Sequence, residues 1–189
     1  MTTTVVRTPL TDLITRIRTV VARGLSDGDT ARHVAEYLRP ALGQPGLLAP
    51  HQRAGSEEGY TQHVLHVEPD GSFSVVALVW LPGQATPVHD HVSWCTVGVY
   101  EGQETEILYR LAGRKGRRRL VASGHTVNRR GEVTGIAPPG DIHRVSNSGT
   151  TKAISLHVYG ADIGKLGSSI RRVYDLSGGA PPADGRMNP

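Results

Sequence analysis

The sequence has little cysteine and no long apolar run: a single cysteine occurs among its 189 residues. One cysteine cannot form an intramolecular disulfide or a cysteine-rich zinc site. No apolar stretch approaches the roughly 20 residues that a membrane-spanning helix needs. The beginning of the sequence also lacks the basic and apolar segments of a secretory signal. We therefore expect a cytoplasmic protein that has no membrane partner.

Aromatic residues are also scarce, at 5% of the chain, whereas basic residues exceed acidic ones and give a formal net charge of +4. Much of this surplus lies in residues 110–120, RLAGRKGRRRL. The run has no aromatic side chain on which a base could stack, and Gly113 and Gly116 are typical of a turn between strands. We therefore expect a solvated hairpin and no nucleic-acid partner. The weaker alternative, a nucleic-acid surface, would bind with a steep salt dependence.

The first third of the sequence is predicted to be helical. Residues 9–24 carry apolar side chains at helical spacing, and Thr8 is placed to cap that helix. A second short helix is predicted over residues 29–38, and Pro40 is expected to stop it. We expect residues 1–55 to form an N-terminal helical segment that packs on the domain that follows.

Short segments rich in β-branched and aromatic residues begin near Tyr60, and turn residues such as Asp70-Gly71 separate them. About eight such segments at this spacing predict a mostly β fold, an antiparallel sandwich or jelly-roll barrel. The barrel is predicted to cover residues 56–176 as one domain. Residues 177–189 are polar and rich in Gly and Pro, and they are predicted to form a flexible tail.

Two histidines stand one residue apart in TPVHDHVSWC, residues 86–95, which ends on the single cysteine. Side chains alternate along a strand, so His89 and His91 face the same side and can bind one metal ion together. Cys95 shares that face if no bulge intervenes. The pair alone is weak evidence, because nearby histidines on a half-buried strand are often only hydrogen-bonded.

A third histidine, His143, follows a Pro-Pro-Gly turn in PPGDIHRVSN. Its surroundings resemble the second cupin motif, with the spacing Pro138-x-Gly140-x-x-His143-x-x-x-Asn147. The first cupin motif is matched at Gly83, His89-x-His91 and Gly102. The resemblance implies a cupin double-stranded β-helix that holds a metal ion inside the barrel through His89, His91 and His143.

Most cupins carry a metal-binding glutamate at the position of Cys95, so this chain would be left with three neutral imidazoles. The usual mononuclear iron site of oxygenases has two histidines and a carboxylate instead. Three neutral ligands preserve the full charge of a divalent ion and favour an anionic ligand. A thiolate is soft enough to coordinate iron and supplies the missing negative charge. The site therefore indicates oxidation of a bound thiol.

Three polar residues alternate in ISLHVYG, so Ser155, His157 and Tyr159 face one side of a strand and can form a hydrogen-bond chain. The segments HDHVSWC, IHRVSN and SLHVY, in this order, resemble cysteine dioxygenase and related thiol dioxygenases. That resemblance implies a mononuclear Fe(II) cofactor and an enzyme that adds both oxygen atoms of O2 to a small thiol, giving a sulfinate.

The resemblance also assigns roles to the remaining candidates. Ser155, His157 and Tyr159 would act as a relay, with the tyrosine hydroxyl near the substrate. Cys95 matches the family's cysteine that can form a thioether with the active-site tyrosine, here Tyr159; the alternative is an inert buried thiol. Trp80 matches a family position that packs near the site.

The identity of the thiol stays open. Cysteine-specific members have an arginine near the position of Gln62, which follows Tyr60 in YTQHV. Gln62 cannot form a bidentate ion pair with a carboxylate, so we expect Arg171 or Arg172 to supply the charge, with Tyr60 and Gln62 as further substrate-binding residues. Cys95 favours L-cysteine. Gln62 and Gly160 favour the alternative, 3-mercaptopropionate.

Other functional classes remain as competing hypotheses. One is a manganese- or nickel-dependent cupin that acts on a non-thiol, and another is a non-catalytic cupin sensor. The sequence shows no helical DNA-recognition motif that would support a sensor. A monomer or a weak homo-oligomer is expected.

Overall fold

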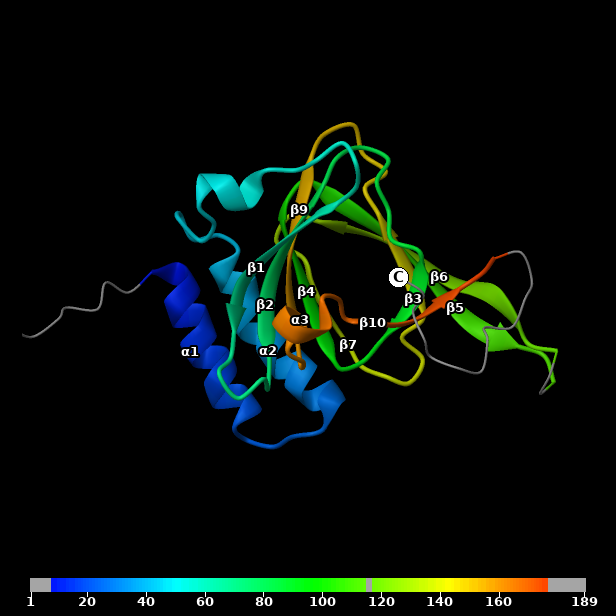
Figure 1. Ribbon diagram of the computed structural model, residues 1–189, viewed down its shortest axis with the longest axis horizontal. Helices are drawn as coiled ribbons and strands as arrows, with labels where there is room; N and C mark the ends of the chain where they lie inside the picture. Colours follow the sequence, from blue (N-terminus) through cyan, green and yellow to red (C-terminus); the bar gives the residue numbers. More distant parts are fainter. Residues whose placement is uncertain (1–7, 115–116, 177–189) are drawn as a thin grey trace, which may run out of the picture.

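The computed structural model describes residues 8–114 and 117–176, which form two antiparallel sheets flanked by helices (Figure 1). The helices are α1 (Pro9–Val21), α2 (Asp27–Ala41), the 3-10 helix η1 (Pro50–Arg53) and α3 (Ile163–Leu166). The predicted tail over 177–189, together with Lys115 and Gly116 of the basic run, lies outside the described residues.

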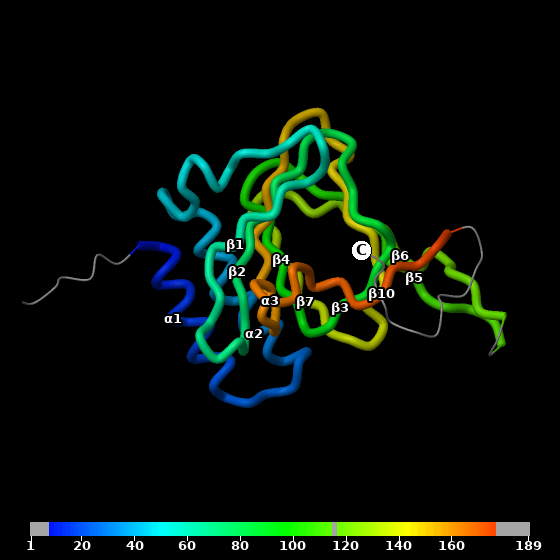
Figure 2. The backbone as a smooth tube through the Cα atoms, viewed as in Figure 1, coloured from blue at the N-terminus to red at the C-terminus, as the bar shows by residue number. Residues whose placement is uncertain are grey.

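Each sheet has five strands. The first sheet has the order β1 (Thr61–Val67), β2 (Ser74–Trp80), β9 (Ala153–Tyr159), β4 (Cys95–Glu101), β7 (Val133–Ile136). The second has the order β10 (Ile170–Tyr174), β3 (Val88–His91), β8 (His143–Ser146), β5 (Gln103–Ala112), β6 (Arg119–Arg129). Strands distant in sequence therefore lie side by side, as the backbone trace in Figure 2 also shows. The predicted mostly β, double-stranded β-helix fold is confirmed.

Two central strands of the first sheet, β2 and β9, are covered on both faces. All seven residues of β2 and all seven of β9 are buried. On β9, the apolar residues Ile154, Leu156 and Val158 belong to the core shared with α1 and α2. The intervening residues point into the barrel, so β9 separates an apolar layer outside from a polar site inside.

The N-terminal helices follow the predicted pattern with one difference. Thr8 caps α1 as expected, by accepting a hydrogen bond from the Thr11 N–H. The prediction that Pro40 stops the second helix was wrong, because α2 runs to Ala41. A proline so close to the helix end removes only one hydrogen bond, and Leu38 and Leu42 continue to pack on the sheet there.

The basic run forms the predicted turn between strands, as far as the structure describes it. β5 ends at Ala112 and β6 begins at Arg119, and the hairpin extends away from the barrel (Figure 1). Gly113 has a φ of 109°, which favours glycine. Among the described residues, no helix is both long and apolar enough to cross a membrane.

The contact between α2 and the first sheet yields a stability prediction. Leu38 is fully buried and packs close to Gly98 of β4, so Leu38→Ala leaves a cavity and is expected to lower the free energy of unfolding by about 2–5 kcal/mol. Leu166→Ala, at a position that is 49% exposed, is expected to cost less than about 1 kcal/mol. Urea unfolding of both variants measures the difference, and equal stabilities would contradict this packing.

Candidate active site

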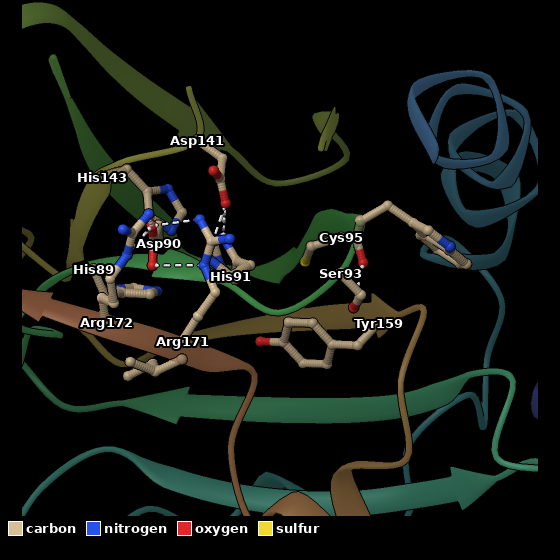
Figure 3. Close-up of polar contacts among 12 residues, drawn as sticks. His89, Asp90, His91, Ser93, Cys95, Asp141, His143, Tyr159, Arg171 and Arg172 are labelled. Carbon is tan, nitrogen blue, oxygen red and sulfur yellow. Dashed lines mark hydrogen bonds and ion pairs between the residues drawn. The ribbon is translucent and has the colours of Figure 1, made fainter. Parts of the chain in front are cut away.

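Three histidines converge inside the barrel, from two neighbouring strands. His89 and His91 lie on β3, and His143 begins β8 directly opposite His89 in the register. All three are buried, and one ring nitrogen of each lies within 4.8 Å of those of the other two. Figure 3 shows the imidazoles gathered at one end of the site. The predicted metal ligands are thus brought together.

The second ring nitrogen of each histidine is already engaged. The partners of the Nδ1 atoms are the Pro87 carbonyl for His89 (3.0 Å), Asp141 for His91 (3.1 Å) and Glu106 for His143 (2.6 Å). Because these oxygens accept a hydrogen bond from the Nδ1–H group, the Nε2 lone pairs are free to point at a common ion. This arrangement is the one expected around a bound divalent metal.

The pKa shifts of the histidines and of the neighbouring carboxylates also favour a metal site. Burial, together with the charges of His143 and His91, lowers the pKa of His89 to about 3. Burial also lowers the pKa of His91, against the opposing influence of Asp141. Burial would raise the pKa values of Glu106 and Asp141, but hydrogen bonds with the histidines hold both below their ordinary values. Neutral imidazoles beside two carboxylates present donor atoms and negative charge to a cation.

The predicted hydrogen-bond chain on β9 is confirmed. The Ser155 Oγ lies 2.9 Å from His157 Nε2, and the Tyr159 hydroxyl lies 2.9 Å from His157 Nδ1. Burial lowers the pKa of His157 to about 3, so the ring is neutral at neutral pH. Trp80 extends the contact by donating its indole N–H to Ser155 Oγ at 3.2 Å. The chain therefore joins the pocket to the interior of the barrel.

Cys95 is the register partner of Tyr159 on the neighbouring strand. Its thiol is fully buried and lies 3.9 Å from His157 Nδ1, and burial raises its pKa well above the ordinary value. The chain leaves the second sheet after His91 and enters the first at Cys95, so residues 92–94 interrupt the alternation on which the prediction was based. Cys95 faces the interior because β4 starts a new alternation there.

One pocket contains the three histidines, the relay tyrosine and two predicted substrate residues, Tyr60 and Gln62. Tyr60 packs against Trp80 with ring centroids 4.6 Å apart. The Gln62 side chain donates to the Gly167 carbonyl at 3.0 Å. The described lining includes no arginine or lysine; its other members are Leu78, Trp80, Thr86, Val145, His157, Ser168, Ser169 and Ile170.

Arg171 and Arg172 do not line this pocket. Both guanidinium groups bind Asp90, at 2.7 and 2.6 Å, together with the Tyr174 hydroxyl. Asp90 stands between the two histidines of β3 and so points to the opposite face of that strand. The expectation that one of these arginines faces the substrate is therefore not met. Despite burial, these hydrogen bonds hold the pKa of Asp90 at about 2.

Sequence reasoning missed the carboxylates Asp141, Glu106 and Glu104. Asp141 and Glu106 bind His91 and His143 from 50 and 37 residues away in the sequence. Glu104 is 1% exposed, and burial raises its pKa to about 7. For Glu104 and Glu106, the available signal was the Glu-x-Glu spacing in a predicted strand, which puts the two acidic side chains on one face.

The double-stranded β-helix and its inward histidines define a cupin with a centre suited to a metal ion. The sequence model of one family, described as cysteine dioxygenase type I, matches residues 1–166. The chain belongs to this family.

Individual relatives are more distant. The chain is 32% identical over 102 residues to cysteine dioxygenase type 1 of Danio rerio, covering 53% of this chain and 50% of that protein. The identity to the Homo sapiens protein of the same name is 30% over the same length and coverage. The match spans about half the length of these relatives. A solved structure from Klebsiella pneumoniae, described as a protein with a double-stranded beta-helix domain, has a TM-score of 0.44 and 21% identity, covering 63% of this chain and 92% of that chain.

The support of His143 by Glu106 can be tested directly. Glu106→Gln removes the charged partner of the ligand imidazole, and the affinity for Co2+ or Fe2+ is expected to fall about 10- to 100-fold. The control is Glu101→Gln, the same change at a partly exposed ion pair with Arg53. Anaerobic metal titration measures both variants. Equal affinities would mean that Glu106 does not support the site.

Proposed function

We propose that this chain is a mononuclear Fe(II) thiol dioxygenase that oxidises a small thiol carboxylate to the corresponding sulfinate with O2. The observation that carries the proposal is one pocket that holds three convergent imidazoles and the hydroxyl of a tyrosine relay, in a chain of the cysteine dioxygenase type I family. His89, His91 and His143 would hold the iron. When bound, the iron would supply a redox centre with open positions for the thiol and dioxygen.

The residues around that centre bind and shield the reactants. Leu78, Val145 and Ile170 give the pocket apolar walls, which exclude water and strengthen the polar contacts within it. The Tyr159 hydroxyl would orient the bound reactants, and His157 and Ser155 would hold that hydroxyl in place. The reaction adds both oxygen atoms to the thiol sulfur and releases no other product.

For the substrate we propose L-cysteine, with 3-mercaptopropionate as the second candidate. The family description and Cys95 support cysteine. The uncharged Gln62 and the glycine after the tyrosine support 3-mercaptopropionate. A Cβ at Gly160 would lie 2.2 Å from the Trp94 indole nitrogen, so this turn has no room for a proline. Either carboxylate would be bound by neutral donors, among which are Tyr60, Gln62 and Ser169.

The proposed activity predicts thiol-dependent oxygen consumption by the iron-loaded chain. We expect one sulfinate per O2 consumed, and we expect L-cysteine to have a higher kcat/KM than 3-mercaptopropionate. An oxygen electrode combined with mass detection of the sulfinates measures both quantities. The matched control is His143→Ala, which removes one proposed ligand and is expected to abolish turnover.

A strong preference for 3-mercaptopropionate would overturn the substrate and keep the reaction class. Oxygen consumption without sulfinate, or none with either thiol, would overturn the class.

The position of Cys95 opposite Tyr159 predicts partial formation of a thioether between them during turnover. The crosslink removes one hydrogen from the thiol and one from the ring, and O2 is the oxidant. Intact-mass measurement after incubation with iron, thiol and oxygen is expected to show a species lighter by two hydrogens. Cys95→Ser is expected to lack it, and an unmodified mass in the parent chain would contradict the prediction.

A further inference from the structure

The second sheet carries a separate apolar cluster on its outer face, the face turned away from the three histidines. Its members are Val88, Tyr109, Leu111, Leu120, Ile142 and Tyr174. Val88 alternates with the inward His89 on β3, so its side chain points outward. The helices α1 and α2 pack instead on the first sheet, and in Figure 1 they lie on the far side of the barrel from β3, β5 and β10. The cluster is therefore separate from the core that these helices close.

A groove of about 260 Å3 opens over this cluster. Tyr109 and Leu111 of β5 line it, together with Pro139 and Ile142 from the segment before β8. A cavity of about 150 Å3 with an apolar lining can hold a benzene-sized ligand. The groove therefore has room for at least one large apolar side chain.

The charged side chains of the groove are mainly basic. Arg110, Arg171 and Arg172 line it, and the acidic residue in its described lining is Asp90. Asp90 Oδ2 accepts from Arg171 at 2.7 Å and from Arg172 at 2.6 Å, so one carboxylate is shared by two cations. The side chains of these two arginines are still 43% and 45% exposed. Three cations against one anion give the lining a net charge of +2, which is open to an anionic ligand.

The neighbouring β5–β6 hairpin adds charge of the same sign. Residues 107–131 contain seven arginines, one lysine and no acidic residue. The whole chain has a net charge of +4, so the residues outside this stretch together carry −4. The hairpin extends away from the barrel, and Arg117 and Arg118 near its tip are exposed (Figure 1). Charge of one sign on a projecting element attracts an anionic partner from a distance.

We infer that the groove and the hairpin form a docking surface for an acidic segment of a partner protein, one that carries an apolar side chain among its carboxylates. The apolar side chain would occupy the floor formed by Tyr109, Leu111 and Ile142. The carboxylates would bind the solvent-facing N–H groups of Arg171 and Arg172 in charge-assisted hydrogen bonds. The inference is independent of the proposed function, because the groove and the three-histidine pocket share no lining residue.

The same features argue against other occupants of the groove. A second copy of this chain, docked on the same face about a two-fold axis, would bring two basic hairpins together, and like charges repel. The phosphates of a nucleic acid or of a lipid surface would pair with the arginines but would leave the apolar floor uncovered. An acidic peptide segment with an apolar side chain matches both parts of the surface.

The first experiment measures binding of a synthetic probe to the full chain, loaded with zinc so that no turnover occurs. The probe is a fluorescent peptide with one leucine between two pairs of glutamates. We expect saturable binding with a Kd below about 1 mM. We expect binding to be about tenfold weaker when alanine replaces the leucine or lysine replaces the glutamates. The absence of saturable binding, or equal binding of the three peptides, would overturn the inference.

The hairpin charges are tested by the association rate of the probe. Charges at the rim of an interface act mainly on kon, so Arg118→Glu combined with Arg119→Glu is expected to lower kon about tenfold at low salt and to change koff little. Arg23→Glu combined with Arg39→Glu makes the same change of net charge at exposed positions on the helical side. This control is expected to retain most of the parent rate. Equal rates for the two double variants in stopped-flow mixing would mean that the hairpin does not attract the probe.

The groove floor is tested by the dissociation rate of the probe. Leu111→Ser removes an apolar contact at the centre of the surface and is expected to raise koff about tenfold while kon stays unchanged. Leu166→Ser makes the same change at a position in α3 that is 49% exposed, and it is expected to keep the parent koff. If Leu111→Ser fails to fold, Tyr109→Ser is the second floor variant with the same expected result. An unchanged koff in the folded floor variant would overturn the inference.

The other occupants give distinct results in two further measurements. A dimer of the parent chain in sedimentation, dissociated by Leu111→Ser, would show that a second copy covers this face and would overturn the inference. Tighter binding to a DNA duplex or to vesicles that contain phosphatidylserine than to the glutamate peptide would also overturn it.

Discussion

The double burial of β9 is the constraint on which the rest of the structure depends. A strand covered on both faces has no solvent in which to place polar side chains, so each one must find a partner within the protein. The apolar face of β9 binds the helices, and that layer contributes most of the hydrophobic core. The opposite face then holds Ser155, His157 and Tyr159 at fixed spacing, because β9 is paired with β2 on one side and with β4 on the other. The stability of the helical layer and the precision of the relay are thus two results of one strand.

Buried carboxylates organise the site from a second layer. Asp141 and Glu106 orient the imidazoles of His91 and His143. Glu104 is buried on the same face of β5 as Glu106. The negative charge of Asp141 and Glu106 would compensate for a divalent ion held by three neutral imidazoles, with that charge one hydrogen bond away from the proposed ligands. In the proposed function, the remaining coordination positions would then be open to the substrate.

The sequence could predict what is local or tied to a motif. His89 and His91 share a strand, and alternation alone places them together; His143 was reached through a motif resemblance. The hydrogen-bond chain on β9 follows from the same alternation. Long-range pairings could not be predicted, because nothing within β5 shows that Glu106 meets His143. The prediction that Arg171 or Arg172 faces the substrate failed for the same reason, because the register of β10 against β3 decides where these side chains lie. The end of α2 depended on packing by Leu38 and Leu42, which outweighed the local signal of Pro40.

β3 is only four residues long, and the side chains on its two faces make different contacts. The inner face presents two imidazoles, and on the outer face Asp90 anchors the C-terminal strand through Arg171, Arg172 and Tyr174. That strand follows directly on Ser168 and Ser169, which line the pocket. The ligands and the rim of the pocket are therefore mechanically coupled through a single short element. Substitution of Asp90 would therefore disturb both the rim of the pocket and the three-histidine site, although Asp90 itself does not line the pocket.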